Sequence, residues 1–223
     1  MRDALFLHIQ KTAGTSVHAM AHGVYGKENT ISHADYQKLG VDGCRKKAFV
    51  SGHFGHVFAS QLMEGRYSFT FLRDPVDRLI SMYGYCRSHQ DTTSVVFDAA
   101  KKLDLYEFLG RADQTEFREM LWNHQVWQLG YGWGADINTR PWLTINNFGE
   151  DDLLEIAKQN LLRFQYVGFV ETFSTDIRKI FADLGVNRIG IPKENRAAQR
   201  TTQADLPPKT IKRLLELTEL DRA

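Results

Sequence analysis

The chain has 223 residues, 43% of them hydrophobic and 25% charged, so it is long enough to bury a substantial core. Its formal net charge of +1 excludes the strong overall field that is typical of proteins that bind nucleic acid or membrane surfaces. No part of the sequence approaches the roughly 20 consecutive apolar residues of a membrane-spanning helix.

The cysteines and the first residues of the chain indicate the cellular compartment in which we expect the protein. The two cysteines, Cys44 and Cys86, form no CxxC pair, so we expect reduced thiols and no disulfide framework. Residues 1–3 lead almost directly into an apolar run, which leaves no room for a signal peptide. We therefore expect a cytoplasmic protein with one domain over residues 1–223, unless the sequence is a trimmed piece of a secretory-pathway enzyme.

Short apolar runs alternate with helical patterns along the chain, which predicts an α/β fold with a central parallel sheet in a three-layer sandwich. Ligands of such sheets bind beyond the carboxyl ends of the strands. Strands are predicted over Ala4–Ile9, Lys47–Ser51, Tyr67–Leu72 and Tyr166–Val170. Helices are predicted over Gly14–His22, Val57–Met63, Val76–Arg87, Thr92–Leu109, Gln114–Leu129, Asp151–Asn160, Phe173–Leu184 and Lys209–Leu220.

The most informative motif follows the first predicted strand and reads Lys11-Thr12-Ala13-Gly14-Thr15-Ser16. A turn of small residues at a helix N-terminus presents backbone N–H groups that bind phosphate, and the lysine and hydroxyl groups add further donors. An ordinary capped turn would explain Gly14 and one hydroxyl, but not a lysine beside three hydroxyls. The order also differs from a Walker A loop, in which the lysine comes last. We therefore predict an anion-binding loop.

The second motif spans Phe69–Tyr83. A buried strand brings Arg73 to its carboxyl end, Pro75 opens a helix, and Ser81 lies about two turns further along. An arginine and a serine placed in this way can bind a second phosphate. The alternative is that Arg73 pairs with a neighbouring aspartate and that Ser81 is an incidental surface residue.

Together these motifs resemble those of the sulfotransferases that use 3′-phosphoadenosine-5′-phosphosulfate (PAPS), and above all the carbohydrate branch with the heparan sulfate 2-O- and 6-O-sulfotransferases. In that family a Lys-Thr-x-x-Thr-[Ser/Thr] loop holds the 5′-phosphosulfate, and an Arg-Asp-Pro-x-x-Arg-x-x-Ser segment holds the 3′-phosphate. The resemblance implies a P-loop-kinase-like fold. It assigns the donor's 5′ end to Lys11, Thr12, Ala13, Gly14, Thr15 and Ser16, and its 3′-phosphate to Arg73 and Ser81.

Weaker similarities extend the match to Asn123-His124-Gln125, Val167–Glu171 and Glu194-Asn195-Arg196. Ala13 replaces a glycine that many relatives carry, and a small side chain is expected to fit there.

A histidine is the candidate general base. Ser51-Gly52-His53-Phe54-Gly55-His56 follows a predicted strand, and glycines beside a histidine allow a substrate to approach. The Gly52-His53 pair is similar to the catalytic histidine region of the 2-O-sulfotransferases, so we prefer His53 and keep His56 as the alternative. A structural role for either histidine stays open. A zinc site made of His8, His53 and His56 lacks supporting carboxylates and is not predicted.

Aromatic and polar residues between positions 122 and 142 are the candidates for acceptor binding, because ring faces suit the C–H faces of a sugar. Trp133 lies in a glycine-rich stretch and is the best candidate, whereas Trp122 and Trp127 fit a helix core. A basic series near the C-terminus fits either an anionic ligand or a solvated face. The further residues are Gly130, Tyr131, Gly132, Gly134, Asp136, Asn138, Arg140 and Trp142, and the basic series is Arg188, Lys193, Arg196 and Arg200.

The sequence thus predicts a sulfotransferase that moves a sulfuryl group from PAPS to a hydroxyl of a carbohydrate or glycoconjugate and releases 3′,5′-bisphosphoadenosine (PAP). His53 is expected to accept the proton and Lys11 to stabilise the leaving phosphate, with no metal and no nucleic-acid partner. One alternative is a P-loop nucleotide or sugar kinase that uses ATP and Mg²⁺, and another is a non-catalytic glycan-binding module. The pattern defines neither the acceptor's regiochemistry nor the oligomeric state.

Overall fold

The computed structural model describes residues 1–90, 93–134, 149–191 and 201–223, and in these residues five strands form one parallel sheet. The sheet order is β2-β3-β1-β4-β5. The strands are β1 (Ala4–Leu7), β2 (Thr30–Ile31), β3 (Phe49–Gly52), β4 (Tyr67–Leu72) and β5 (Tyr166–Phe169). The predicted α/β fold with a central parallel sheet is therefore confirmed.

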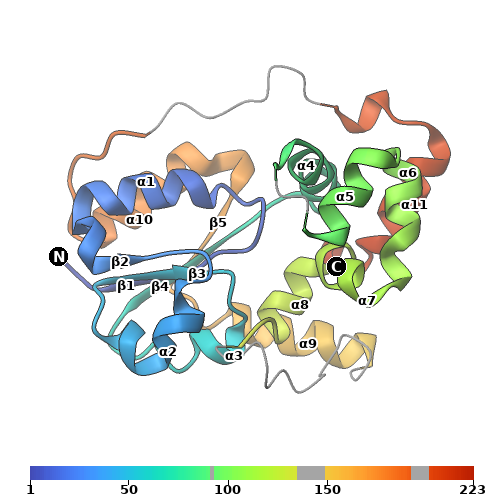
Figure 1. Ribbon diagram of the computed structural model, residues 1–223. Coiled ribbons are helices and arrows are strands. Elements are labelled where there is room, and N and C mark those ends of the chain that lie inside the picture. The colour runs from blue at the N-terminus through green and yellow to red at the C-terminus, as the bar shows by residue number, and fades with distance from the viewer. Residues whose placement is uncertain (91–92, 135–148, 192–200) are drawn as a thin grey trace.

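Helices cover both faces of the sheet (Figure 1). α1 (Gly14–Tyr25) and α10 (Phe173–Asp183) lie on one face, and α2 (Asp35–Arg45) and α3 (His56–Ala59) lie on the other. Side chains of a strand alternate between these layers. Phe6 packs in the core beneath α1 and α10, whereas Leu5 and Leu7 belong to the second core. The result is a three-layer sandwich.

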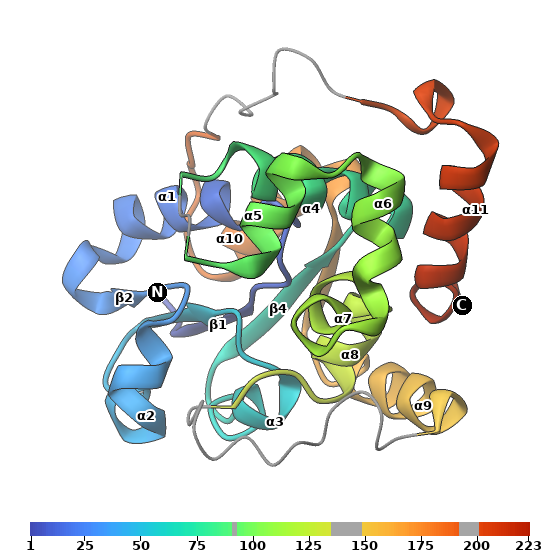
Figure 2. The same cartoon turned by 45° about the vertical axis from the view of Figure 1, so that its right-hand side comes forward.

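A second group of helices lies to one side of the sheet in Figures 1 and 2. Within the described ranges, no helix combines the length and the apolar character needed to cross a bilayer. The helices of this group are α4 (Pro75–Ser88), α5 (Val95–Lys102), α6 (Leu105–Leu109), α7 (Thr115–Leu121), α8 (His124–Gly130), α9 (Glu150–Leu161) and α11 (Pro208–Leu217).

The predicted helix over Thr92–Leu109 is in fact two helices, α5 and α6. The break is a capping box, in which Asp104 accepts the N–H of Glu107 at 2.8 Å and Glu107 accepts the N–H of Asp104 at 3.1 Å. This box satisfies two donors at the start of α6, so a new helix begins there. The Asp-x-x-Glu spacing was visible in the sequence and could have located this break. The predictions also missed the short strand β2 and helix α2.

The predicted helix over Gln114–Leu129 is also wrong, because the chain breaks into α7 and α8 at Asn123. This residue has a left-handed backbone, with φ 41°, which asparagine tolerates better than most residues. Its side-chain oxygen accepts the backbone N–H groups of Leu220 at 2.9 Å and Asp221 at 3.2 Å. The break is therefore held by a segment almost a hundred residues further along the chain.

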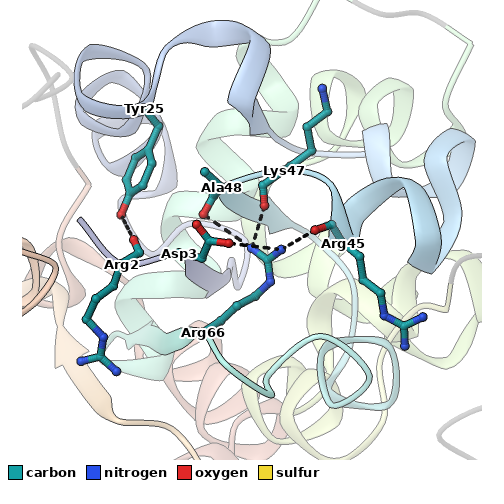
Figure 3. Close-up of polar contacts among 7 residues, drawn as sticks. All are labelled: Arg2, Asp3, Tyr25, Arg45, Lys47, Ala48 and Arg66. Atoms are coloured by element: carbon teal, nitrogen blue, oxygen red, sulfur yellow. Dashed lines mark hydrogen bonds and ion pairs between the residues drawn. The ribbon is translucent and has the colours of Figure 1, made fainter.

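A buried arginine joins the amino ends of three strands (Figure 3). Arg66, 7% exposed, donates to the carbonyl oxygens of Lys47 at 2.7 Å, Arg45 at 3.0 Å and Ala48 at 3.5 Å. Its guanidinium also lies 4.0 Å from the carboxylate of Asp3. Burial lowers the pKa of Arg66, and these acceptors replace the water that the cation loses. Arg66 thus stabilises the amino edge of the sheet. The carboxyl edge, where ligands are expected, lies at the other end of the strands.

Two glycines let the loop after β3 touch the segment after α8. The N–H of Gly55 donates to the carbonyl oxygen of Trp133 at 2.8 Å, next to a bridge between Phe54 and Trp133. A Cβ atom on Gly55 would lie 1.8 Å from the carbonyl oxygen of Tyr131 and 2.3 Å from the Cα of Gly132. Gly132 itself needs its glycine conformation, with φ 70°. No side chain fits in this contact.

We expect Gly55→Ala to destabilise the protein by about 1–3 kcal/mol, because a methyl group would force two backbone segments apart. Gly84→Ala is the matched control. A Cβ atom at this exposed position in α4 meets nothing within 4 Å, so the change should stabilise the protein by up to about 1 kcal/mol. Urea unfolding followed by circular dichroism measures both, and equal stability of the Gly55 variant and the parent would contradict this view of the contact.

Candidate functional site

The predicted anion-binding loop joins β1 to α1 at the carboxyl edge of the sheet. Lys11 and Ala13 have left-handed backbones, with φ 69° and 67°. Such alternation turns successive N–H groups toward one point. Within the described residues, no backbone carbonyl accepts the N–H groups of Lys11, Thr12 or Ala13. The loop therefore presents free donors at the positive end of the α1 dipole.

The hydroxyl groups of the loop have different roles. Thr12 is fully buried, and its hydroxyl donates to the carbonyl oxygen of Ile9 at 2.8 Å. This hydroxyl therefore stabilises the loop, whereas the sequence predicted that it would bind the anion. Thr15 is exposed and Ser16 is half-buried, so these two hydroxyls can reach a ligand.

Gly14 is required by the ring of His8. A Cβ atom at position 14 would lie 1.8 Å from the Nε2 atom of His8, so even alanine would displace this ring. The loop and the end of β1 are packed against each other without space for a side chain.

Lys11 and Arg73 place two cations at one site. The Nζ atom of Lys11 lies 4.3 Å from the ring centroid of Tyr85, and the backbone carbonyl of Lys11 accepts from the Arg73 guanidinium at 3.2 Å. Burial, followed by the charge of Arg73, lowers the pKa of Lys11. The structure thus brings together the two motifs that were predicted to bind separate phosphates.

The backbone of Arg73 is held by Gln125. The Arg73 N–H donates to the Oε1 atom of Gln125 at 3.0 Å, and its carbonyl accepts from the Nε2 atom at 3.0 Å. The residues around Arg73 start α4, because Asp74 caps this helix through the N–H of Asp77 at 2.8 Å. Glu171, from the weak motif after β5, accepts the N–H of Asp74 at 3.0 Å. Ser81 is half-buried in α4, about two turns from its start.

His53 is oriented by the backbone. Its Nδ1 atom lies 3.0 Å from the carbonyl oxygen of His8, and its N–H donates to the carbonyl oxygen of His33 at 3.1 Å. A carbonyl can only accept, so Nδ1 carries the proton and Nε2 keeps its lone pair. Burial lowers the pKa of His53 to about 4. The ring is therefore neutral at pH 7 and can accept a proton at Nε2.

Other histidine rings surround His53. The centroid of His53 lies 4.4 Å from that of His8 and 5.5 Å from that of His33, and His33 stacks on His18 at 5.4 Å. Burial holds the pKa of His8 well below its usual value and lowers that of His18 to about 3. Even so, no group of three or more His, Cys, Asp or Glu side chains among the described residues is arranged to hold a metal ion.

His56 lies apart from these rings. It is buried at the start of α3, and its ring centroid lies 6.1 Å from that of Phe164. Burial lowers the pKa of His56 to about 4 as well. Its lowered pKa does not distinguish it from His53, but of the two rings that of His53 is hydrogen-bonded to His8, which lies between β1 and the anion-binding loop. The choice of His53 over His56 as the base stays a prediction.

The aromatic candidates differ in burial. Trp122 and Trp127 are buried, which supports the core interpretation. Trp133 is half-buried, lies 4.8 Å edge-on from Trp127, and donates its Nε1–H to Glu119 at 2.9 Å. Of the remaining candidates, Tyr131 is half-buried and Arg188 is exposed. Several other candidates lie outside the described residues, and these are Asp136, Asn138, Arg140, Trp142, Lys193, Glu194, Asn195, Arg196 and Arg200.

Sequence reasoning missed several residues of this site. Gln128 and Asp221 carry no motif of their own, and they reach the site through contacts between distant segments. His33 has a left-handed backbone with φ 50°, and its carbonyl position beside His53 depends on a loop fold that its neighbours do not encode. Gln125 was noted only as part of a weak similarity, which gave no hint that it holds Arg73.

Comparison with known proteins agrees with this geometry. A family model described as "Sulfotransferase family" matches residues 2–222, a range that includes the anion-binding loop, His53 and Arg73. No curated protein matches the chain.

We expect the ring of His53 to protonate near pH 4, because burial disfavours the imidazolium form. Nuclear magnetic resonance of ¹⁵N-labelled histidine rings would measure both the pKa and the tautomer, with His53→Ala used to assign the signal. Protonation near the ordinary value of about 6.5, or a proton on Nε2 in the neutral ring, would contradict the geometry described for this residue.

Proposed function

Because the chain belongs to the sulfotransferase family, we propose that it transfers a sulfuryl group from PAPS to a hydroxyl group of a carbohydrate or glycoconjugate. The observation that carries the proposal is the hydrogen bond between the Arg73 guanidinium and the Lys11 carbonyl, which joins the two cationic motifs into one site. His53 lies next to this site, and its ring is hydrogen-bonded to the carbonyl oxygen of His8, between β1 and the anion-binding loop.

The donor would bind across the two motifs. The N–H groups of residues 11–15, with the side chains of Lys11, Thr15 and Ser16, would hold its 5′-phosphosulfate. Arg73 and Ser81 would hold its 3′-phosphate, through the charge-assisted hydrogen bonds that favour arginine at phosphate sites. Because these contacts lie away from the sulfur, they would supply binding energy and exclude nucleotides without a 3′-phosphate.

The chemical step is an in-line displacement at sulfur. The acceptor oxygen forms a bond to sulfur while the bond between sulfur and the bridging phosphate oxygen breaks, and the hydroxyl proton passes to Nε2 of His53. The products are a sulfate ester and PAP. The transition state is expected to be loose, as in phosphoryl transfer, so that positioning and charge stabilisation dominate. Lys11 and the loop N–H groups would stabilise the charge that grows on the departing phosphate.

The acceptor class rests on the resemblance to the carbohydrate branch and on the aromatic residues near His53. Trp133 lies in the segment whose backbone contacts Phe54 and Gly55, and its half-buried ring is the surface that we propose for a sugar. Screening sugars and glycoconjugates by mass spectrometry for an added sulfate, with PAPS as donor, would identify the acceptor.

We expect PAP to raise the melting temperature of the protein more than ATP with Mg²⁺ does, because only PAP has a 3′-phosphate for Arg73. In calorimetry, Arg73→Ala should weaken PAP binding by about 10–100-fold, which corresponds to the loss of one charge-assisted hydrogen-bonded contact. A preference for ATP with Mg²⁺ would instead support a kinase, and unchanged PAP affinity in the variant would remove Arg73 from the donor site.

We expect His53→Ala to lower kcat by about 10²–10⁴-fold, the usual effect of removing a general base. PAP affinity should be retained, because the proposed donor contacts lie elsewhere. His56→Ala is the matched control and should keep most of the activity. If instead His56→Ala abolishes turnover and His53→Ala does not, the base is His56. If the parent protein binds glycans but transfers no sulfate from PAPS, it is a binding module.

A further inference from the structure

Helix α8 (His124–Gly130) is short, yet every one of its residues is buried. It lies between the sheet and the outer helices, beside the loops that follow β1, β3 and β4. Its glutamines, Gln125 and Gln128, are three residues apart and so lie on neighbouring positions of the helix surface. Both side chains leave the helix and bond to the backbone of those loops.

The first glutamine holds the residue proposed for the 3′-phosphate. Gln125 is 4% exposed and forms a pair of hydrogen bonds with the backbone of Arg73, each 3.0 Å long. These two bonds from one amide hold the two peptide groups on either side of the Arg73 Cα atom. The direction in which the Arg73 side chain leaves the backbone is therefore set by α8.

The second glutamine holds the loops on either side of the base. Gln128 is fully buried, and its Nε2 atom donates to the carbonyl oxygens of His8 at 3.1 Å and Phe54 at 3.0 Å. The same carbonyl of His8 accepts from Nδ1 of His53. Phe54 is the next residue after His53. One amide group thus fixes the acceptor of the His53 ring and the chain that carries this ring.

The start of α8 is itself anchored from a distance. The carboxylate of Asp221 accepts the N–H groups of Gln125 at 3.3 Å and Val126 at 2.8 Å. This satisfies backbone donors in the first turn of the helix, which its own residue Asn123 does not cap. A helix held in this way is a rigid base for side chains that must reach other elements.

We propose that Gln125 and Gln128 are positioning residues with separate tasks in the reaction. Gln125 orients Arg73 for the donor, and Gln128 orients His53 for proton transfer, so that one buried helix sets the donor site and the base relative to each other. This inference rests on the proposed function. It adds that the two glutamines affect different steps, donor binding and proton transfer. A helix that only supported the fold would not separate these effects.

The test compares Gln125→Met with Gln128→Met, a matched pair with the same loss of an amide from the same helix. Gln125→Met should raise the Kd of PAP and the KM of PAPS by about tenfold and leave kcat at saturating PAPS within about threefold. Gln128→Met should lower kcat by about 10–100-fold, because small displacements of a reacting group have effects of this size, and should leave the Kd of PAP unchanged.

Two results would overturn the inference. One is that both variants change PAP affinity and kcat in the same proportion, as expected if α8 only supports the fold. The other is that neither variant changes either quantity. If a methionine variant does not fold, Gln125→Asn and Gln128→Asn replace the pair, since asparagine keeps the amide but is too short to reach the same carbonyls.

A second readout does not need the substrate. In ¹⁵N spectra of the histidine rings, Gln128→Met should alter the hydrogen-bonded Nδ1–H signal of His53, and Gln125→Met should leave it unchanged. Loss of this contrast overturns the inference even in a protein that binds no PAP. A parent protein that shows the contrast but neither binds PAP nor transfers sulfate would refute the proposed function alone.

Discussion

The carbonyl oxygen of His8 is the point on which the site depends. It accepts hydrogen bonds from the ring of His53 and from the amide of Gln128, so both of its lone pairs are used. His8 directly follows β1 and precedes the anion-binding loop, and its ring fills the space beside Gly14. A single peptide therefore links the loop, the base and the buried helix α8. A shift of this peptide would displace the hydrogen-bond acceptor that orients the ring of His53.

The electrostatics of the free site favour an anion. Burial lowers the pKa of Lys11, and the neighbouring charge of Arg73 lowers it further. Positive charges are thus held together at a cost in free energy, beside N–H groups that no backbone carbonyl accepts in the described part of the chain. The lowered pKa values of His8 and His53 keep these two rings neutral at pH 7, so they add no further positive charge. A ligand with several negative charges would relieve this strain.

The parts of the site that depend on residues close together in the chain could be predicted from the sequence. The apolar runs located β1, β3, β4 and β5, and Lys11, Arg73 and His53 follow three of them, as the carboxyl ends of parallel strands require. What could not be predicted depends on distant segments. The break at Asn123 needs the backbone of Leu220, and the two hydrogen bonds of Gln128 cross from α8 to loops that lie far away in sequence. That the chain forms one domain over residues 1–223, and that individual site residues have the roles given to them, stay predictions.

The hydrogen bonds between Asp221 and α8 also have a consequence for the order in which the parts of the site become available during synthesis. The anion-binding loop, His53 and Arg73 all leave the ribosome well before the turn at residues 217–222, which supplies the acceptors and donors that hold Asn123 and the start of α8. A nascent chain that lacks this turn has the residues of the site but not the partners that hold Asn123 and the start of α8. We therefore expect the chain to become able to bind its ligand only after this turn has been synthesised.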